Sequence, residues 1–166
     1  AALPENGIEA RIPEHYRAIL PDSDPYELEA FAPFRVHERS ASSFRSGRVL
    51  LAGDAAHVCN PFGGLGLTSG LLDGNLLGDA LPAVIHGAAH DDLLDRYAAE
   101  RRRVFLEVTG PTAAENKRRL KETDPDRKRA DNERFARVRD DPQFQREMLT
   151  FTYKLLGRPI GLPPTA

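Results

Sequence analysis

An acidic residue, a glycine-rich loop and the start of a helix follow one another in the chain, and together they could bind a polar, partly anionic ligand. Gly53 and Asp54 end the apolar run 49–52, which is typical of a short buried strand. The next residues form a loop whose backbone a ligand can approach closely, because it contains Pro61, Gly63, Gly64 and Gly66. A helical pattern begins at Gly66, so unpaired N–H groups and the positive end of the helix dipole face the loop.

Four glycines, Gly66, Gly70, Gly74 and Gly78, recur at intervals of four and therefore form one stripe along this helix. Each glycine costs a helix about 1 kcal/mol relative to alanine. The stripe predicts that a neighbouring backbone or a flat group lies against it. For the lower glycines we expect close packing on a sheet or another helix, and for Gly66 we expect a ligand.

The ordered set of motifs resembles the second flavin-binding motif of the FAD-dependent aromatic hydroxylases, the class A flavoprotein monooxygenases related to para-hydroxybenzoate hydroxylase and phenol hydroxylase. The family pattern is Gly-Arg-Val before a strand, Gly-Asp-Ala-Ala-His, a proline, Gly-Gly-x-Gly and a helix that carries an aspartate. The chain has these motifs at Gly47 to Val49, Gly53 to His57, Pro61, Gly63 to Gly66 and Asp73. The likeness extends over roughly residues 34–105 and includes His37, Glu38, Arg39, Tyr97, Glu100, Arg101 and Arg102. The chain departs from the pattern at Thr68, where asparagine is common, and at Gly74 and Gly78, where alanine is commoner.

The resemblance implies how the loop would hold FAD. The carboxylate of Asp54 would accept hydrogen bonds from the ribityl hydroxyls, and residues 61–67 would form a wall at the flavin ring. The backbone N–H groups of residues 65–67 would lie near the pyrimidine edge of that ring. The predicted cofactor-binding residues are Gly53, Asp54, Pro61, Gly63, Gly64, Leu65, Gly66 and Leu67. The resemblance assigns no catalytic side chain and no metal ligand.

The implied function is part of an FAD-dependent monooxygenase. Such an enzyme uses NAD(P)H and O₂ to hydroxylate an aromatic or similarly activated substrate through a flavin hydroperoxide. Two alternatives stay open: a non-catalytic remnant or interaction module that pairs through its C-terminal helices, and an FAD oxidase or dehydrogenase without hydroxylation. By itself, the chain is expected to bind FAD poorly and to be inactive.

Other polar residues near the loop favour structural roles. For His57 we expect a hydrogen bond within the loop rather than a general base, and for Cys59 a small apolar role rather than a redox role. Asp73 and Asn75 lie in an otherwise apolar helix, so we expect them to cap a neighbouring backbone or to pair with a buried arginine. Residues 97–102 are expected to pin their helix to the flavin domain.

The composition is that of a soluble globular domain, with 40% apolar and 29% charged residues and a net charge of −2, which argues against a dedicated nucleic-acid binder. No run is long enough for a membrane span or a signal peptide. The single cysteine fits a cytoplasmic protein without an internal disulfide, and the histidines lack zinc-ligand spacing. Residues 117–139 contain ten basic and five acidic residues, and we interpret them as a solvated helical face rather than a nucleic-acid surface.

The predicted fold class is α/β: the C-terminal part of an FAD/NAD(P)-binding Rossmann-like flavin monooxygenase fold, mostly helical after residue 66. No G-x-G-x-x-G fingerprint for the ADP half of FAD is present. We therefore expect the main partner to be a missing N-terminal FAD-binding half, besides a small aromatic substrate, and a homodimer is left open. We predict three domains. Residues 1–45 form the end of the substrate-domain sheet and its connection, residues 46–110 contain the second FAD-binding motif and the helices of the flavin domain, and residues 111–166 form a C-terminal helical extension.

Periodicity and breakers predict the elements. We expect a short helix over Pro13 to Leu20, one or two strands within 28–39, and a polar turn over 40–47. We expect a helix from Gly66 to about Ile85, kinked or split at Pro82 and stopped by Gly87, and an amphipathic helix over 90–108 broken by Gly110-Pro111. A final helix over 142–156 would dock on the body through Phe144, Met148, Phe151, Thr152 and Leu155, followed by an extended or disordered tail.

Overall fold

The computed structural model describes residues 8–20, 27–32 and 35–163, and the chain divides into two compact units, 1–35 and 36–166. In the first unit, α1 spans Ile8–Ile19. A helix is therefore confirmed, but its predicted start at Pro13 is wrong, because Pro13 lies inside it. The preceding residues are good helix formers that can begin the helix earlier.

The strands predicted within 28–39 are not found where the structure describes this segment. Residues 27–32 and 35–38 have no regular structure, and the first strand begins at Arg39. A strand needs a neighbour for its backbone hydrogen bonds, and within this segment only Arg39 has a described strand partner, Val58. Pro33 and Phe34, which belonged to the prediction, lie outside the described residues.

Four two-residue strands precede the long helices. β1 (Arg39–Ser40) pairs antiparallel with β4 (His57–Val58), and β2 (Arg45–Ser46) pairs antiparallel with β3 (Val49–Leu50). The predicted strand is thus confirmed at 49–50, but Val49 is 63% exposed, so the prediction of a buried strand is wrong. The turn predicted over 40–47 is partly replaced by β2, and a tight turn at 47–48 joins β2 to β3.

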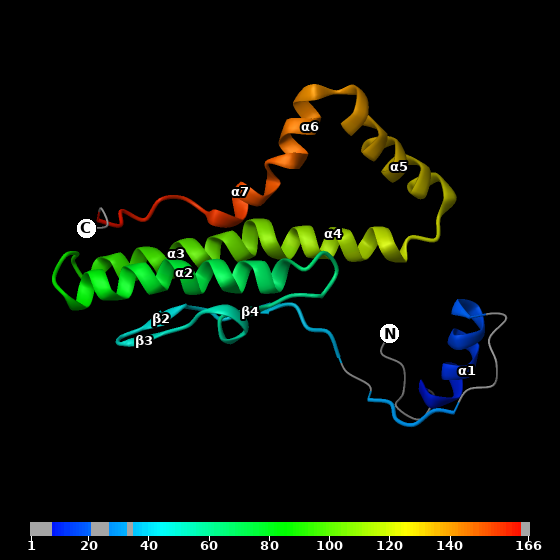
Figure 1. Ribbon diagram of the computed structural model, residues 1–166, viewed down its shortest axis with the longest axis horizontal. Helices are drawn as coiled ribbons and strands as arrows, with labels where there is room; N and C mark the ends of the chain where they lie inside the picture. The colour runs from blue at the N-terminus through cyan, green and yellow to red at the C-terminus, as the bar shows by residue number, and fades with distance from the viewer. Residues whose placement is uncertain (1–7, 21–26, 33–34, 164–166) are drawn as a thin grey trace. The chain divides into compact units, whose positions relative to one another are not determined.

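α2 spans Leu65–Ile85 and lies side by side with α3 (Asp92–Val104), as Figure 1 shows. The predicted helix is confirmed, and Pro82 does not split it. Pro82 lies in the last turn, where the carbonyl that loses its donor belongs to exposed Gly78 and can bind water. The helix ends just before Gly87, as predicted.

The predicted break at Gly110-Pro111 is wrong. α3 continues through a π-helical segment, Phe105–Thr109, into α4, which spans Gly110–Lys121. A proline is tolerated because a π segment already departs from the α-helical bonding pattern, so the missing N–H and the ring can be accommodated. The chain therefore forms one long helical path from Asp92 to Lys121 (Figure 1).

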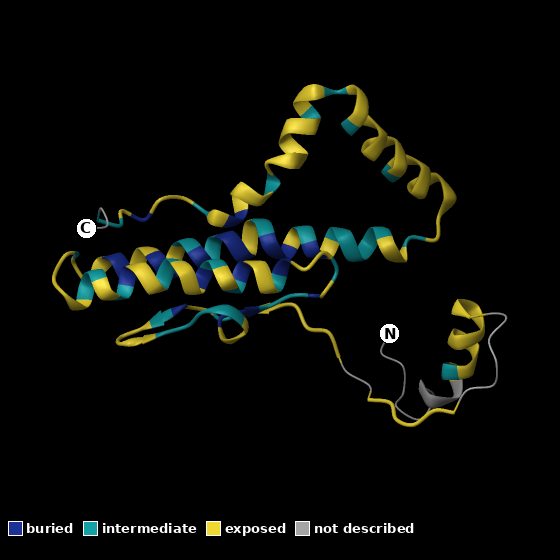
Figure 2. Cartoon of the chain, in the orientation of Figure 1, coloured by how far each residue is buried: buried dark blue, intermediate teal, exposed yellow. Residues whose placement is uncertain are grey.

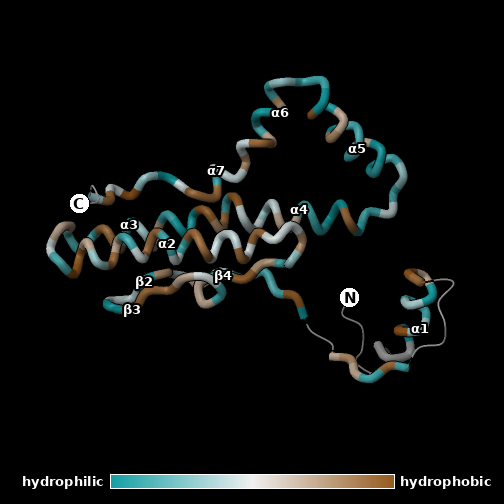
Figure 3. The backbone as a smooth tube through the Cα atoms, in the orientation of Figure 1, coloured by the Kyte–Doolittle hydropathy of each residue, from teal (hydrophilic) through white to brown (hydrophobic). Residues whose placement is uncertain are grey.

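The C-terminal helices are α5 (Pro125–Asp140), α6 (Pro142–Leu149) and α7 (Phe151–Leu156). α5 has no buried residue and is largely hydrophilic (Figures 2 and 3), which confirms a solvated face. The single helix predicted over 142–156 is two helices separated at Thr150. Of the side chains expected to dock, Leu155 is buried, Phe144 and Phe151 are half-buried, and Met148 and Thr152 are exposed.

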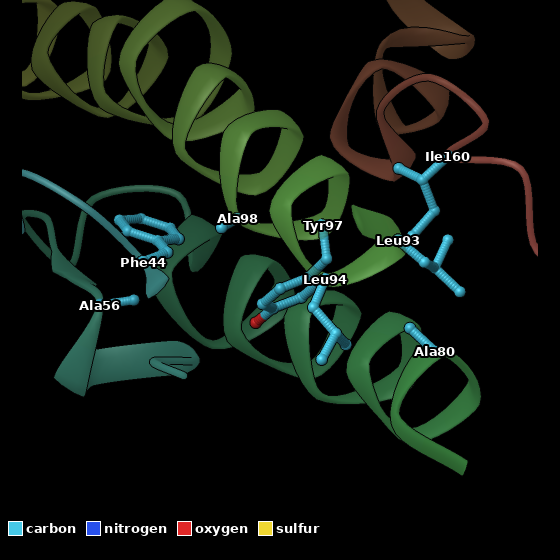
Figure 4. Close-up of a cluster of buried hydrophobic side chains, with 8 residues drawn as sticks. All are labelled: Phe44, Ala56, Ala80, Leu93, Leu94, Tyr97, Ala98 and Ile160. Carbon is cyan, nitrogen blue, oxygen red and sulfur yellow. The ribbon is translucent and has the colours of Figure 1, made fainter. Parts of the chain in front are cut away.

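The core of the second unit lies where α2 and α3 face each other and the strands (Figure 2). Tyr97 and Leu93 of α3 are fully buried, and Phe44, near Ala98, belongs to the same cluster (Figure 4). The irregular tail also contributes Ile160, because Arg96 Nε donates to the Ile160 carbonyl at 2.7 Å. This mostly helical architecture with few strands is the predicted fold class. Among the described residues, no helix is long and apolar enough to cross a membrane.

Candidate functional site

Asp73 of α2 is the centre of a buried polar network. Its Oδ2 accepts a hydrogen bond from the Gly53 N–H at 3.0 Å and lies 2.8 Å from His57 Nε2, and its Oδ1 accepts from Arg101 Nε at 2.6 Å. The three side chains are at most 2% exposed. An ionised carboxylate only accepts hydrogen bonds, so His57 Nε2 carries the hydrogen in this pair. The expected pairing of Asp73 with a buried arginine or a neighbouring backbone is confirmed, whereas the same expectation for Asn75 is wrong, because Asn75 is exposed and its side chain makes no described hydrogen bond.

The network keeps Asp73 charged. Burial works to raise the pKa of Asp73, but the hydrogen bonds from His57 and Arg101, the positive charge of Arg101 and the Gly53 N–H outweigh it, so this pKa lies below its usual value. A buried carboxylate is stable only when such partners surround it. The ring of His57 stacks on Phe105 with centroids 4.6 Å apart. His57 thus makes a structural hydrogen bond, as predicted, but with Asp73 of α2 and not within the loop.

Arg101 joins three helices. Its Nη1 donates to the carbonyls of Leu155 and Leu156 at 2.8 and 3.2 Å, and its Nη2 donates to the carbonyl and hydroxyl of Ser69 at 3.4 Å. One guanidinium thus satisfies two carbonyls at the end of α7 and holds them to α2. Such a planar set of donors suits arginine better than lysine.

Neighbouring residues of α3 hold the strand segment. Tyr97 Oη donates to the Leu51 carbonyl at 2.9 Å, and Arg102 Nε donates to the Ala41 carbonyl at 3.1 Å. Glu100 pairs with Arg103 at 2.5 Å and accepts from the Arg158 N–H at 2.6 Å. The predicted pinning role of residues 97–102 is confirmed by these contacts.

The network clamps the turn that carries Asp54. Residues Gly53–Ala55 form a 3₁₀ turn, and Gly53 adopts φ +59°, a conformation that favours glycine. A Cβ on Gly70 would lie 3.1 Å from the Gly53 Cα, so the turn and α2 are in close backbone contact. Asp54 itself is exposed and makes no hydrogen bond within the described part of the chain. The turn is therefore fixed while its carboxylate remains available.

The glycine-rich loop is held against α4. Asn116 Nδ2 donates to the Phe62 carbonyl at 3.3 Å. Gly63 has φ +104°, a conformation that favours glycine, and a Cβ there would lie 2.5 Å from the same nitrogen, so the Asn116 side chain would have to shift. Pro61, Gly63 and Gly64 are exposed, so the loop presents its backbone to the outside.

The start of α2 presents free amide groups. Gly64 is the N-cap residue, and no side chain caps the helix. The N–H groups of Leu65, Gly66 and Leu67 have no described hydrogen-bond partner, as expected for the first turn of a helix. Leu65 is buried, Gly66 is half-buried and Leu67 is 74% exposed. The predicted cofactor residues thus lie in two neighbouring places: the Asp54 turn and the loop that leads into α2.

Cys59 lies beside this helix start, where a Cβ on Gly66 would meet its Sγ at 3.4 Å. Burial raises the pKa of the Cys59 thiol, and the negative charges of Glu38 and Asp54 raise it further. A protonated thiol is a poor nucleophile, which agrees with the small apolar role expected for Cys59.

The glycine stripe of α2 behaves differently along its length. Gly70 packs on the backbone of Gly53, as expected. A Cβ on Gly74 or Gly78 would meet no described atom within 4 Å, so the expected packing of these lower glycines is wrong within the described chain. Their side of α2 is open because no segment among the described residues covers it.

Sequence reasoning missed two features of the site. It did not connect Asp73 with Gly53, and it did not identify Arg101 as the arginine that Asp73 binds. A signal existed for the second pair, since Asp73 lies in an otherwise apolar helix and Arg101 falls on the apolar side of the next, amphipathic helix. The hydrogen bond of the Gly53 N–H, in contrast, depends on a turn that no spacing rule describes.

Comparison with known proteins identifies the family. A sequence profile described as an FAD binding domain matches residues 4–111. The chain is 44% identical over 163 residues to para-nitrophenol 4-monooxygenase of Pseudomonas sp. (strain WBC-3), which covers 96% of this chain and 40% of that protein. It is 43% identical over 157 residues to 6-hydroxy-3-succinoylpyridine 3-monooxygenase of Pseudomonas putida (strain DSM 28022 / S16), which covers 90% of this chain and 40% of that protein.

The structural comparison agrees. The crystal structure of p-nitrophenol 4-monooxygenase from Pseudomonas putida DLL-E4 matches with a TM-score of 0.80 and 45% identity, over 95% of this chain and 40% of that one. The chain thus spans 40% of the length of these relatives. With its glycine-rich loop, its clamped Asp54 turn and these matches, the chain belongs to the FAD-dependent aromatic hydroxylase family.

Proposed function

We propose that this chain is the C-terminal part of an FAD-dependent monooxygenase that uses NAD(P)H and O₂ to hydroxylate an aromatic or similarly activated substrate. Two relatives that match at least 90% of the chain are monooxygenases by name. The remaining length of such a protein would supply the N-terminal FAD-binding half and most of the substrate pocket.

The observation that carries the proposal is the set of free hydrogen-bonding groups at the loop. The unbonded N–H groups of residues 65–67 lie at the positive end of α2, and the carboxylate of Asp54 is exposed nearby. The amides suit the pyrimidine edge of a flavin, where negative charge gathers on reduction. The carboxylate suits ligand hydroxyl groups, because it only accepts hydrogen bonds.

The surroundings fit a flat cofactor. Gly63 and Gly64 lie exposed before the helix start, so no side chain there obstructs a ring. FAD would supply the redox chemistry when bound. The residues of this chain would bind and orient it: the Asp54 turn through its carboxylate, and residues 63–67 through their backbone.

The exposed apolar side of α2 suggests where the N-terminal half packs. Leu67, Leu71 and Ile85 are 74%, 65% and 69% exposed, and they share one side of the helix with Gly74 and Gly78. An apolar stripe of this kind usually marks a surface that another part of a protein covers. We propose that the N-terminal FAD-binding half packs on it.

The test is Asp54→Ala in the full-length protein. We expect the wild type to be yellow and to oxidise NAD(P)H, and the variant to bind FAD at least about tenfold more weakly, because it loses a charged hydrogen-bond acceptor. Bound flavin is measured by visible absorbance after dialysis. Asp79→Ala is the matched control, since Asp79 is an exposed aspartate of α2 without a described hydrogen bond.

The outcomes separate the alternatives. FAD binding that is unchanged in Asp54→Ala would contradict the role assigned to this residue. NAD(P)H consumption that yields only peroxide with every phenol tried would favour an oxidase. A full-length protein that binds no FAD would favour the non-catalytic module. Location in the cytoplasm, which the single thiol supports, and assembly as a homodimer stay predictions.

A further inference from the structure

A segment near the C-terminal end of the described chain lies along α3. We call it the C-terminal strap and define it as residues 155–161, which are the last two residues of α7 and the irregular residues that follow them. It runs antiparallel to α3, because the Arg158 N–H donates to Glu100 at 2.6 Å and the Ile160 carbonyl accepts from Arg96 Nε at 2.7 Å. Figure 1 shows the segment beside α3, and Ile160 is buried in the core cluster of Figure 4.

The strap reaches the Asp54 turn through Arg101. This guanidinium is fully buried, and its Nη1 donates to the carbonyls of the last two residues of α7 while its Nε donates to Asp73. The group is rigid and planar, so the position of the two carbonyls determines where Nε points. Asp73 in turn accepts from the Gly53 N–H and so holds the turn that carries Asp54. A strap that moved away would leave buried donors of Arg101 without acceptors, which is unfavourable.

The strap also reaches the start of α2. Leu155 is 1% exposed and shares a small hydrophobic cluster with Leu65 and Ala113. Leu65 is the first residue of α2 and one of the three whose N–H groups have no described partner. One segment therefore supports both of the neighbouring places in which the predicted cofactor residues lie.

We infer that the C-terminal strap positions the flavin site: by holding Arg101 and Leu65, it fixes the Asp54 carboxylate relative to the free amides of residues 65–67. The inference rests on the proposed function and deepens it, because it adds a determinant of flavin binding that lies outside the predicted cofactor-binding residues. The strap also lies beyond residue 111, where the FAD-binding profile ends.

Two glycines of the strap form a matched pair for testing this role. Gly157 and Gly161 both have φ +80°, so alanine is strained at either position. A Cβ on Gly157 would lie 2.9 Å from Glu100 Oε1 and 3.1 Å from Cγ2 of the fully buried Val104, whereas a Cβ on Gly161 would meet only one described atom, at 3.9 Å. Gly157→Ala should therefore push the strap away from α3, while Gly161→Ala adds similar backbone strain without that clash.

The experiment measures FAD binding by the full-length protein. Each apoprotein is titrated with FAD and followed by flavin fluorescence, at a temperature at which its far-ultraviolet circular dichroism shows that it is folded. We expect Gly157→Ala to bind FAD about tenfold or more weakly than the wild type, and Gly161→Ala to stay within about twofold. The visible circular dichroism of bound FAD, which reports the surroundings of the ring, should change in Gly157→Ala alone. A strap that only stabilised the fold would leave both readings as in the wild type.

A milder pair tests the same role if Gly157→Ala does not fold. Glu100 and Glu107 both pair with Arg103, at 2.5 and 2.6 Å, but only Glu100 accepts a hydrogen bond from the Arg158 N–H of the strap. Glu100→Gln replaces a charged acceptor with a neutral one and should weaken FAD binding by about threefold. Glu107→Gln, the control, should bind FAD as the wild type does.

The outcomes separate this inference from the proposed function. A wild type that binds FAD, with the same affinity and visible circular dichroism in Gly157→Ala and Glu100→Gln, would overturn the inference and leave the proposed function in place. Equal losses of affinity in Gly157→Ala and Gly161→Ala would also overturn it, because strain alone would then explain them. A wild type that binds no FAD would contradict the proposed function and, with it, the inference.

Discussion

Asp73 accepts hydrogen bonds from a histidine, an arginine and a backbone amide in a place that water does not reach. Each partner comes from a different segment, so one carboxylate joins the Gly53 turn, β4 and α3 to α2. Of the residues predicted to bind the cofactor, only Gly53 takes part in this network, through its backbone N–H. At the scale of single residues, the side chains that support the turn are therefore different from those predicted to bind the cofactor.

We predict that Asp73→Asn destabilises the protein by about 3–5 kcal/mol, the usual cost of removing one partner from a buried ion pair. The amide keeps the size of the side chain but leaves Arg101 without a counter-charge. Its NH₂ group would also face one or more of the N–H groups of Gly53, His57 and Arg101, which are themselves donors. The free energy of unfolding is measured by urea denaturation. Asp79→Asn, an exposed aspartate on the same helix, should stay within about 0.5 kcal/mol of the wild type. A similarly small loss for Asp73→Asn would contradict the role of the network.

At the scale of elements, patterns within one segment predicted the helices well. The period of apolar residues placed α2 and most of α3, and the mixture of charges in 117–139 predicted exposed helix. The predictions that failed concerned segments whose structure depends on a partner strand or on an unusual backbone conformation. In the segment 28–39, the described residues before Arg39 form no strand. Gly110-Pro111 does not break the helix, because the π-helical segment before it accommodates the proline ring and the missing N–H.

The glycines of α2 give a prediction with an internal control. Gly70→Ala should weaken FAD binding by the full-length protein, because its Cβ would lie 3.1 Å from the Gly53 Cα and would push the Asp54 turn away. Gly74→Ala should instead stabilise by about 0.5–1 kcal/mol through helix propensity, because its Cβ would meet no described atom within 4 Å and alanine is commoner at this position in the family pattern, so the N-terminal half that we propose to pack there should have room for it. Flavin absorbance after dialysis and urea denaturation measure the two effects. Equal flavin retention by both variants would show that the contact between Gly70 and Gly53 is unimportant for the turn.

At the scale of the whole molecule, the candidate site was predictable only in part. The order of motifs located the loop and the helix start, and the described geometry brings these residues to neighbouring positions. The contacts of Arg119 with Phe135 and of Arg134 with Phe144 could not be predicted, since a run of basic residues on α4 and α5 has the same sequence whether it packs on a ring or faces only solvent. Which of the two occurs depends on the angle between these helices, and that angle depends on contacts between residues far apart in the sequence.

The pH dependence of folding should reflect Asp73. Its pKa in the folded protein is lowered, so the unfolded chain, with a usual value of about 3.9, takes up this proton first as the pH falls. The stability that the charged carboxylate contributes is therefore present above about pH 4 and is lost as the pH falls toward the folded pKa. We expect the free energy of unfolding to fall more steeply below pH 4 for the wild type than for Asp73→Asn. Parallel profiles from urea denaturation at several pH values would contradict this.

The π-helical segment Phe105–Thr109 also sets an angular register along the chain. A turn of this type holds about one residue more than an ordinary turn, and each residue of a helix corresponds to a rotation of about 100°. Losing a single residue there would restore a regular helix, yet it would rotate every later side chain of α4 about the helix axis. Asn116, which holds the glycine-rich loop, and Arg119, which stacks on Phe135, would both point elsewhere. Insertions and deletions at this segment are therefore a direct route by which related chains could exchange one set of facing residues for another.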